Sequence, residues 1–279
     1  MSDLIAVVGA TGKQGGAVVA ALLERGAAVR ALTRDAGSDR ARALAARGVE
    51  VVVADAEDPA ATRAALDGVS ALSLMTTFSG EGGPRGETRR GIVLVEAARD
   101  AGVPFVEHSS GGGAERETGI PHFESKRRVE EALEATGLPH AFVRPVFFME
   151  NLVYQLPPTD AQEAVVRMPM PGNVPLQLIA VVDVGRVVAA LATDPVGSAG
   201  TAVEIAGDEL TLDEIVAQIG AATGVPTRFE RLPVDGLDED RGSMFRWFST
   251  LPAYQADFAA TAALDPQVLT FAEWLVSGR

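Results

Sequence analysis

The stretch LIAVVGATGKQGG, residues 4–16, decides the fold. Its first five residues, LIAVV, are too short and too rich in β-branched side chains for a helix, and they are typical of a strand buried on both faces. The residues after the turn favour a helix with apolar side chains on one side. Gly9, Gly12 and Gly15 fall at the turn between the two elements. The order of strand, glycine turn and helix favours a dinucleotide-binding fold.

Glycines at such a turn allow positive φ angles and let a diphosphate approach the backbone without meeting Cβ atoms. The free N–H groups and the dipole of the following helix then hold the anion. The cofactor-binding residues predicted at this turn are Gly9, Thr11, Gly12, Lys13, Gln14 and Gly15.

Strand-like and helix-like segments alternate through the first half of the chain, as a parallel, doubly wound sheet requires. The sequence therefore predicts an α/β fold: a Rossmann-type doubly wound parallel sheet with a smaller C-terminal α+β substrate lobe. We expect a dinucleotide-binding domain over residues 1–150, its sheet completed by segments near 176–206, and the smaller lobe over 151–279. Further strands are predicted at 28–32, 50–54, 71–75, 105–108, 140–143 and 203–205, and helices near 11–25, 38–47, 60–66, 86–101 and 123–135.

Two helix starts are predicted in the second half of the chain. Asp183 is expected to cap a helix over 184–192, since its side chain can accept free N–H groups of the first turn. Thr211 and Glu214 have the spacing of a capping box. The acidic segment VDGLDEDRGSMFRWF, residues 234–248, is either a lid or a solvated linker.

Composition excludes several classes of function. The 279 residues include no cysteine, which excludes disulfides and thiolate metal sites, and no metal-binding motif is found. A formal charge of −14 disfavours nucleic acid and anionic membranes as partners. No uncharged apolar run reaches the length of a spanning helix, and the first residues, MSD, lack a basic n-region. We expect a cytoplasmic protein, and a homodimer is possible.

The end of the second predicted strand bears on which nicotinamide cofactor is bound. An NAD-preferring fold usually has an acidic residue there, whereas this chain has Arg34, which can pair with a 2′-phosphate and stack on adenine. Lys13 adds a second positive charge, so NADP(H) is predicted. Asp35 follows at once and can instead take the ribose role. Asp55 either accepts from the adenine amino group or caps a turn. Thr76 is a further predicted cofactor contact.

Several motifs together resemble the NmrA-like family of atypical short-chain dehydrogenase/reductases. They are GATGKQGG, the TR after the second strand, VPFVEHSS, PHFESKRRVEEAL, VRPVFFMENL and LTFAEWL, and they extend over almost the whole chain. The resemblance implies a Rossmann domain that binds NADP(H) and a smaller lobe that shapes a substrate pocket. It also implies that the segment containing Phe148 runs under the nicotinamide and that Asn151 hydrogen-bonds substrate or carboxamide.

The resemblance also bears on catalysis. Active reductases of the wider superfamily have a tyrosine four residues before a lysine on one helical face, together with a serine at a strand end. This chain keeps the lysine as Lys126 and the serine as Ser109, but His122 stands where the tyrosine would be. Histidine exchanges protons near neutral pH, so His122 is either a proton donor or a helix-start residue without chemistry. Ser109 either orients a carbonyl or satisfies the turn that follows it.

Two functions follow from these residues. One is an NADPH-dependent reductase of a small carbonyl, quinone or imine-type substrate, with catalytic residues Lys126, His122 and Ser109. The other is a non-enzymatic NADP(H) redox sensor that regulates a protein partner, which requires different affinities for two conformations. The presence of both Ser109 and Lys126 favours the reductase.

Overall fold

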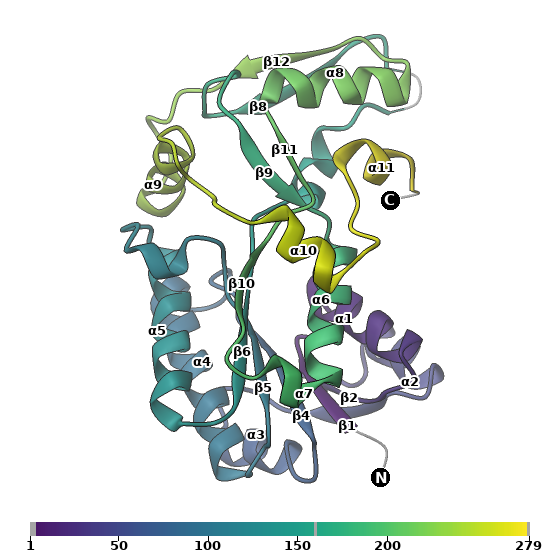
Figure 1. Cartoon of the computed structure of the whole chain (residues 1–279), viewed down its shortest axis with the longest axis vertical. Helices are drawn as coiled ribbons and strands as arrows, with labels where there is room; N and C mark the ends of the chain where they lie inside the picture. Colours follow the sequence, from purple (N-terminus) through teal and green to yellow (C-terminus); the bar gives the residue numbers. More distant parts are fainter. Residues whose placement is uncertain (1–3, 159–160, 278–279) are drawn as a thin grey trace.

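Seven parallel strands form the central sheet of the computed structural model, which describes residues 4–158 and 161–277 (Figure 1). Their order is β10-β6-β5-β4-β1-β2-β3, with β1 in the interior and the chain winding outward from it in both directions. All neighbouring pairs are parallel, so the carboxyl ends of the strands meet at one edge. The strands are β1 (Leu4–Val8), β2 (Ala28–Thr33), β3 (Glu50–Val53), β4 (Ala71–Met75), β5 (Val106–Ser109), β6 (His140–Pro145) and β10 (Ala202–Ile205).

Helices cover both faces of this sheet (Figure 1). One buried cluster joins α1 and α6 to one face, and a second joins α4 and α5 to the other. Gly185 of α6 lies so close to α1 that a Cβ there would come within 2.6 Å of the Ala17 carbonyl carbon. The helices of this part are α1 (Lys13–Glu24), α2 (Asp39–Ala46), α3 (Pro59–Ala65), α4 (Gly83–Asp100), α5 (Pro121–Thr136), α6 (Val181–Thr193), α7 (Pro195–Ser198) and the 3-10 turn η1 (Ala114–Arg116).

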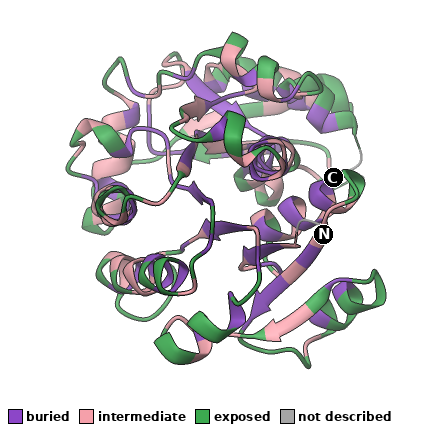
Figure 2. Ribbon diagram, turned by 60° about the horizontal axis from the view of Figure 1, so that its bottom comes forward, coloured by how far each residue is buried: buried purple, intermediate pink, exposed green. Residues whose placement is uncertain are grey.

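A smaller lobe lies beyond the carboxyl edge of the sheet (Figure 1). It has a three-stranded sheet, β11-β9-β7, and a parallel pair, β12-β8, around a third buried cluster. Figure 2 shows the buried residues gathered in the sheets and on the inward sides of the helices. The elements are β7 (Phe147–Phe148), η2 (Met149–Gln155), β8 (Ala164–Met168), β9 (Leu176–Ile179), β11 (Asp208–Leu210), α8 (Leu212–Thr223), β12 (Thr227–Arg231), α9 (Glu239–Phe248) and α11 (Phe271–Val276). The short helix α10 (Phe258–Leu264) packs instead on α6 and β10 of the larger part.

The predicted doubly wound α/β fold is confirmed. Each predicted strand is present within one residue of its bounds at either end, apart from the two-residue extension of the strand predicted at 140–143. The edge strand β10 comes from the segment near 176–206 and pairs with β6. Among the residues described, no helix is both long enough and apolar enough to span a membrane.

The two predicted helix caps have different outcomes. The capping box of Thr211 and Glu214 is confirmed, since each side chain bonds the backbone N–H of the other. The prediction that Asp183 caps α6 is wrong, because Ala180 holds that position and Asp183 lies buried in the first turn. Its carboxylate instead pairs with Arg186 and accepts the N–H of Leu269, which ties the C-terminal segment to α6.

Candidate active site

The glycine turn between β1 and α1 leaves no room for a side chain at Gly15. Gly9 has φ +67°, and the N–H of Gly12 donates to its carbonyl oxygen at 2.8 Å. A Cβ on Gly15 would lie 2.3 Å from the Gly9 oxygen and 2.6 Å from its carbonyl carbon. Because α1 begins at Lys13, its first N–H groups point out of this turn at the edge of the sheet. The geometry is that of a cradle for a diphosphate.

Three exposed cations stand at or near this cradle. Lys13 lies in the turn itself, with its Nζ 5.4 Å from the centre of the Tyr154 ring in the smaller lobe. Arg34 follows β2 directly and is exposed. Arg40, on α2, donates from its guanidinium to the Thr11 carbonyl at 3.2 Å. Arg40 was not predicted, because it lies in a polar helix whose approach to the turn has no local signature.

The two aspartates at this edge form turns. The Oδ1 atom of Asp35 accepts the N–H of Gly37 at 2.8 Å, and the Oδ1 atom of Asp55 accepts the N–H of Glu57 at 3.0 Å. Asp55 therefore has the turn-capping hydrogen bond that was one of its two predicted roles.

Lys126 projects from α5 toward the end of β4. Its Nζ lies 3.0 Å from Oε1 of Glu87 and 3.4 Å from the carbonyl oxygen of Thr76. Glu87 is fully buried, and its carboxylate also accepts the hydroxyls of Thr76 and Ser125. Burial raises the pKa of Glu87, but the charge of Lys126 and these hydrogen bonds outweigh burial and hold it below the usual value. Thr76 thus lies beside Lys126, and both stay predicted cofactor contacts.

His122 lies one helical turn before Lys126 and is hydrogen-bonded to Asp240 of the smaller lobe. The backbone N–H of His122 donates to Oδ1 of Asp240 at 2.9 Å, and its Nδ1 lies 2.8 Å from the same oxygen. Phe78 stacks on the imidazole with centroids 4.5 Å apart. Burial lowers the pKa of His122, and the neighbouring Asp240 carboxylate offsets this only in part.

The hydroxyl of Ser109 is bonded to Glu107 and not to Lys126. Its hydroxyl donates to Glu107 at 2.9 Å, as Ser73 does from β4 at 2.8 Å. Phe105, two residues before Glu107, packs in the cluster of α1 and α6, so alternation puts Ser109 on that face. Lys126 belongs to α5 on the opposite face. Burial raises the pKa of Glu107 to about 8, and the structure does not bring Ser109 and Lys126 into contact.

The predicted substrate contacts lie where the chain enters the smaller lobe. Phe148 is half-buried on β7 against the cluster of α1 and α6, and Asn151 is exposed on η2. Aromatic side chains join the lobe to α5, since Trp247 of α9 meets Phe123 edge to face with centroids 5.4 Å apart. Tyr254 packs in turn on Trp247.

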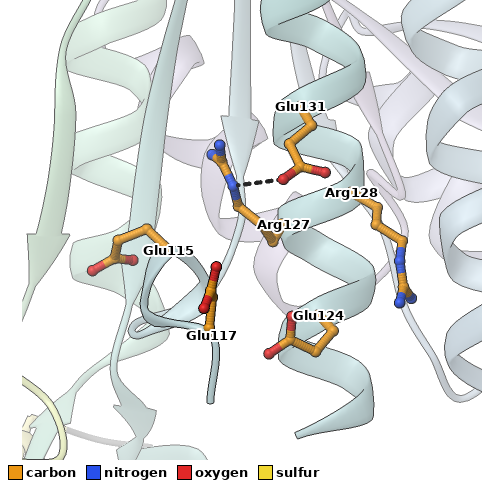
Figure 3. Close-up of a pocket in the computed structure, with 6 residues that line it drawn as sticks. All are labelled: Glu115, Glu117, Glu124, Arg127, Arg128 and Glu131. Atoms are coloured by element: carbon orange, nitrogen blue, oxygen red, sulfur yellow. Dashed lines mark ion pairs between the residues drawn. The ribbon is translucent and has the colours of Figure 1, made fainter. Parts of the chain in front are cut away.

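Two hollows of about 420 Å³ each lie near α5. The first is a groove beside η1 in which Arg127 pairs with Glu131 at 3.2 Å (Figure 3). All of its lining side chains are charged, so it offers no apolar wall to a ligand. The second lies between the loop after β4 and the start of α9 and includes Phe78 and Asp240. These two lining residues contact His122, which does not itself line the hollow. Among the described residues, no three His, Asp or Glu side chains are grouped to hold a metal.

Sequence reasoning missed Glu87 and Asp240, which are the partners of Lys126 and His122. Glu87 stands in the polar stretch GETRRG, where nothing local marks a buried carboxylate. Asp240 is one of four acids in the segment 234–248, and it lies 118 residues from His122. That segment is no linker, because its residues 239–248 form α9, and α9 contacts the start of α5 through Asp240 and Trp247.

Comparisons with known proteins agree with this architecture. The chain matches the NmrA-like family over residues 1–275. It is 30% identical over 233 residues to an NAD(P)H azoreductase from Xenophilus azovorans, covering 83% of this chain and 78% of the relative. An NADPH-dependent quinone oxidoreductase from Escherichia coli, solved with NADPH, superposes with a TM-score of 0.83 at 24% identity and covers 97% and 98% of the two chains. NmrA, a negative transcriptional regulator solved with NAD, has a TM-score of 0.84 at 18% identity, with coverages of 99% and 95%.

Proposed function

This chain belongs to the NmrA-like family, and we propose that it is an oxidoreductase that uses NADPH to reduce a quinone or a related small conjugated acceptor, such as a carbonyl or imine compound. The observation that carries the proposal is the meeting of two features at one sheet edge. The glycine cradle lies at the end of β1, and Lys126, with His122 one turn away on the same helix, lies beside the end of β4. An azoreductase and a quinone oxidoreductase among similar proteins support a flat acceptor.

The residues at the edge fit a nicotinamide dinucleotide. The backbone of the glycine turn would hold the diphosphate, because a Cβ at Gly15 has no space there. Lys13, Arg34 and Arg40 would surround the 2′-phosphate, and Lys126 would hold the nicotinamide ribose, as the family resemblance implies. When bound, NADPH supplies a hydride.

The chain's own groups then manage orientation and protons. Phe78 would orient a flat acceptor at the hollow beside His122 by stacking. A quinone that gains one hydride needs one proton to become a hydroquinone, and the protonated form of His122 would deliver it from Nε2. Aromatic packing between Trp247 of α9 and Phe123 of α5 would exclude water from this side of the site.

The reductase proposal predicts turnover of NADPH with at least one flat acceptor. Purified protein is mixed with NADPH and a panel of quinones, azo dyes, carbonyls and imines, and the loss of absorbance at the reduced nicotinamide band is recorded. A panel with no turnover would overturn the proposal.

A non-catalytic sensor is the second candidate, and one observation favours it. Lys126 is held by Glu87, and Ser109 faces away, so the serine–lysine arrangement of the wider superfamily is not assembled. A sensor would bind a partner protein differently with NADPH and NADP⁺. Capture experiments with each cofactor form, and with none, would reveal the same partners at the same yield if the sensor idea is wrong.

Cofactor choice gives a separate prediction. We expect Arg34→Ala to weaken NADPH binding by about tenfold while leaving NADH almost unchanged, because only NADPH has a 2′-phosphate for the guanidinium to pair with. Arg40→Ala should act in the same direction. Calorimetric titration of both cofactors measures the effect, with Arg25→Ala, an exposed arginine at the far end of α1, as control. Equal losses for both cofactors would mean that Arg34 does not recognise the 2′-phosphate.

A further inference from the structure

Asp240 holds His122 by two hydrogen bonds at once. Oδ1 accepts the backbone N–H of His122 at 2.9 Å, and Nδ1 of the ring lies 2.8 Å from Oδ1 and 2.7 Å from Oδ2. The pair is largely shielded from solvent, with side chains 10% and 16% exposed. Phe78 stacks on one side of the ring and Phe123 meets it edge on, with centroids 4.7 Å apart. The imidazole therefore has one fixed orientation.

The two ring nitrogens consequently have different roles. A carboxylate can only accept, so Nδ1 bears a proton whether the ring is neutral or charged. Nε2 of His122 has no hydrogen-bond partner within the described part of the chain, and it is not among the atoms sealed from solvent. His108 shows the contrast, because its Nδ1 bonds the Leu74 carbonyl while its Nε2 is buried without a partner. His140 also has a bonded Nδ1, 2.8 Å from the Leu138 carbonyl oxygen, and an Nε2 that is not buried, but it lies at the first residue of β6. His122 therefore differs from it by its place beside Lys126 and by its carboxylate partner.

We propose that Asp240 is a positioning residue that locks the Nδ1–H tautomer of His122 and leaves Nε2 as the nitrogen that exchanges a proton with the substrate. The assignment of the Nδ1–H tautomer stands on geometry alone, whereas proton exchange between Nε2 and the substrate rests on the proposed reductase function. Since Asp240 belongs to α9, the tautomer is set only when the smaller lobe is seated against α5. The smaller lobe thus fixes the protonation site of His122 in addition to covering this part of the molecule.

Charged groups from three helices face His122. Asp240 of α9 and Glu87 of α4 favour the imidazolium, whereas Lys126 of α5 opposes it together with burial. Asp238 and Arg241 line the same hollow as Asp240. Loss of the Asp240 charge removes the nearest favourable partner, so it should shift the titration of His122 further toward acid.

The chain contains three histidines, which makes a direct test possible. Imidazole nitrogen resonances of the full-length protein are recorded by nuclear magnetic resonance, and those of His122 are assigned from a His122→Gln variant. We expect the wild type to show the Nδ1–H tautomer, Asp240→Ala to show a mixture with Nε2–H, and Asp240→Glu to restore much of the wild-type pattern. Asp240→Asn, which conserves shape, should lower the pH midpoint of His122 as the Ala variant does.

The control is Asp238→Ala, which removes the N-terminal cap of the same helix without touching His122. It should leave the tautomer and the midpoint unchanged. In turnover assays Asp240→Ala should lower kcat by about tenfold or more and move the pH profile to the acid side, with KM for NADPH unchanged.

The outcomes separate the two proposals. An unaltered tautomer in Asp240→Ala, or the same change in Asp238→Ala, would overturn the positioning role. A shifted tautomer in a protein that turns over no acceptor would uphold the positioning of His122 and remove the reductase function.

Discussion

Gly15→Ala is expected to weaken NADPH binding by about thirty-fold, because the added methyl group would meet backbone atoms and not the end of a flexible side chain. Its Cβ would lie 2.3 Å from the Gly9 oxygen, 2.6 Å from the Gly9 carbonyl carbon and 2.9 Å from the Ala10 nitrogen. Overpacking of this kind typically costs about 2 kcal/mol. The first turn of α1 must move away from β1, and the N–H groups of the cradle move with it.

Gly16→Ala is the matched control. Its Cβ would have one neighbour within 4 Å, the Ala10 oxygen at 3.6 Å, which is ordinary contact, although it lies on the same helix one residue later. Affinity is measured by titration of NADPH, and thermal unfolding without cofactor separates a shifted turn from a loss of fold. Similar affinities in the two variants would show that close packing at Gly15 is not what shapes the cradle.

The central sheet could be predicted from the sequence because each strand has its own local signal. The LIAVV run and the later apolar runs are short and separated by amphipathic helices, and parallel winding leaves few ways to connect them. The pairing in the smaller lobe had no such signal. β8 and β12 pair with Ala164 opposite Thr227, 63 residues later in the chain. Only the apolar cluster that they share with α8 brings them together.

The candidate site was predictable only where one segment supplies the contact. The glycine turn and the helical spacing of His122 and Lys126 are local features. Their partners, Glu87 and Asp240, come from other helices, and their burial depends on packing between elements. Strand alternation was already visible in the sequence, but the buried Glu107 that receives the Ser109 hydroxyl could not be recognised, because glutamate is ordinarily exposed.

Glu87→Gln is expected to lower the free energy of unfolding by about 3 kcal/mol at neutral pH. Glu87 is fully buried and Lys126 is 14% exposed, so the variant leaves an ammonium group without its counter-ion in a place where water compensates poorly. Unfolding in urea measures the change. Glu57→Gln, which removes the partner of Arg89 in an exposed pair, should have little effect.

The pH dependence follows from the direction of the pKa shift. The folded-state pKa of Glu87 lies below its ordinary value of 4.5, so the pair contributes stability above about pH 4.5 and loses it as the pH falls through the folded pKa. The difference between wild type and Glu87→Gln should therefore be full at pH 6 to 8 and shrink in more acid solution. A difference that stays constant down to pH 3 would show that charge is not the cause.

A double variant separates the structural role of this pair from its role toward the cofactor. Lys126→Met alone leaves a buried carboxylate unpaired and should also destabilise, whereas Glu87→Gln with Lys126→Met removes both charges. We expect the double variant to be more stable than either single variant, because a buried ion pair replaced as a whole costs less than one that is broken. NADPH affinity should stay low in both variants that lack Lys126, since no change at Glu87 restores an ammonium group beside the end of β4. Recovery of affinity together with stability would mean that Lys126 serves the fold and does not contact the cofactor.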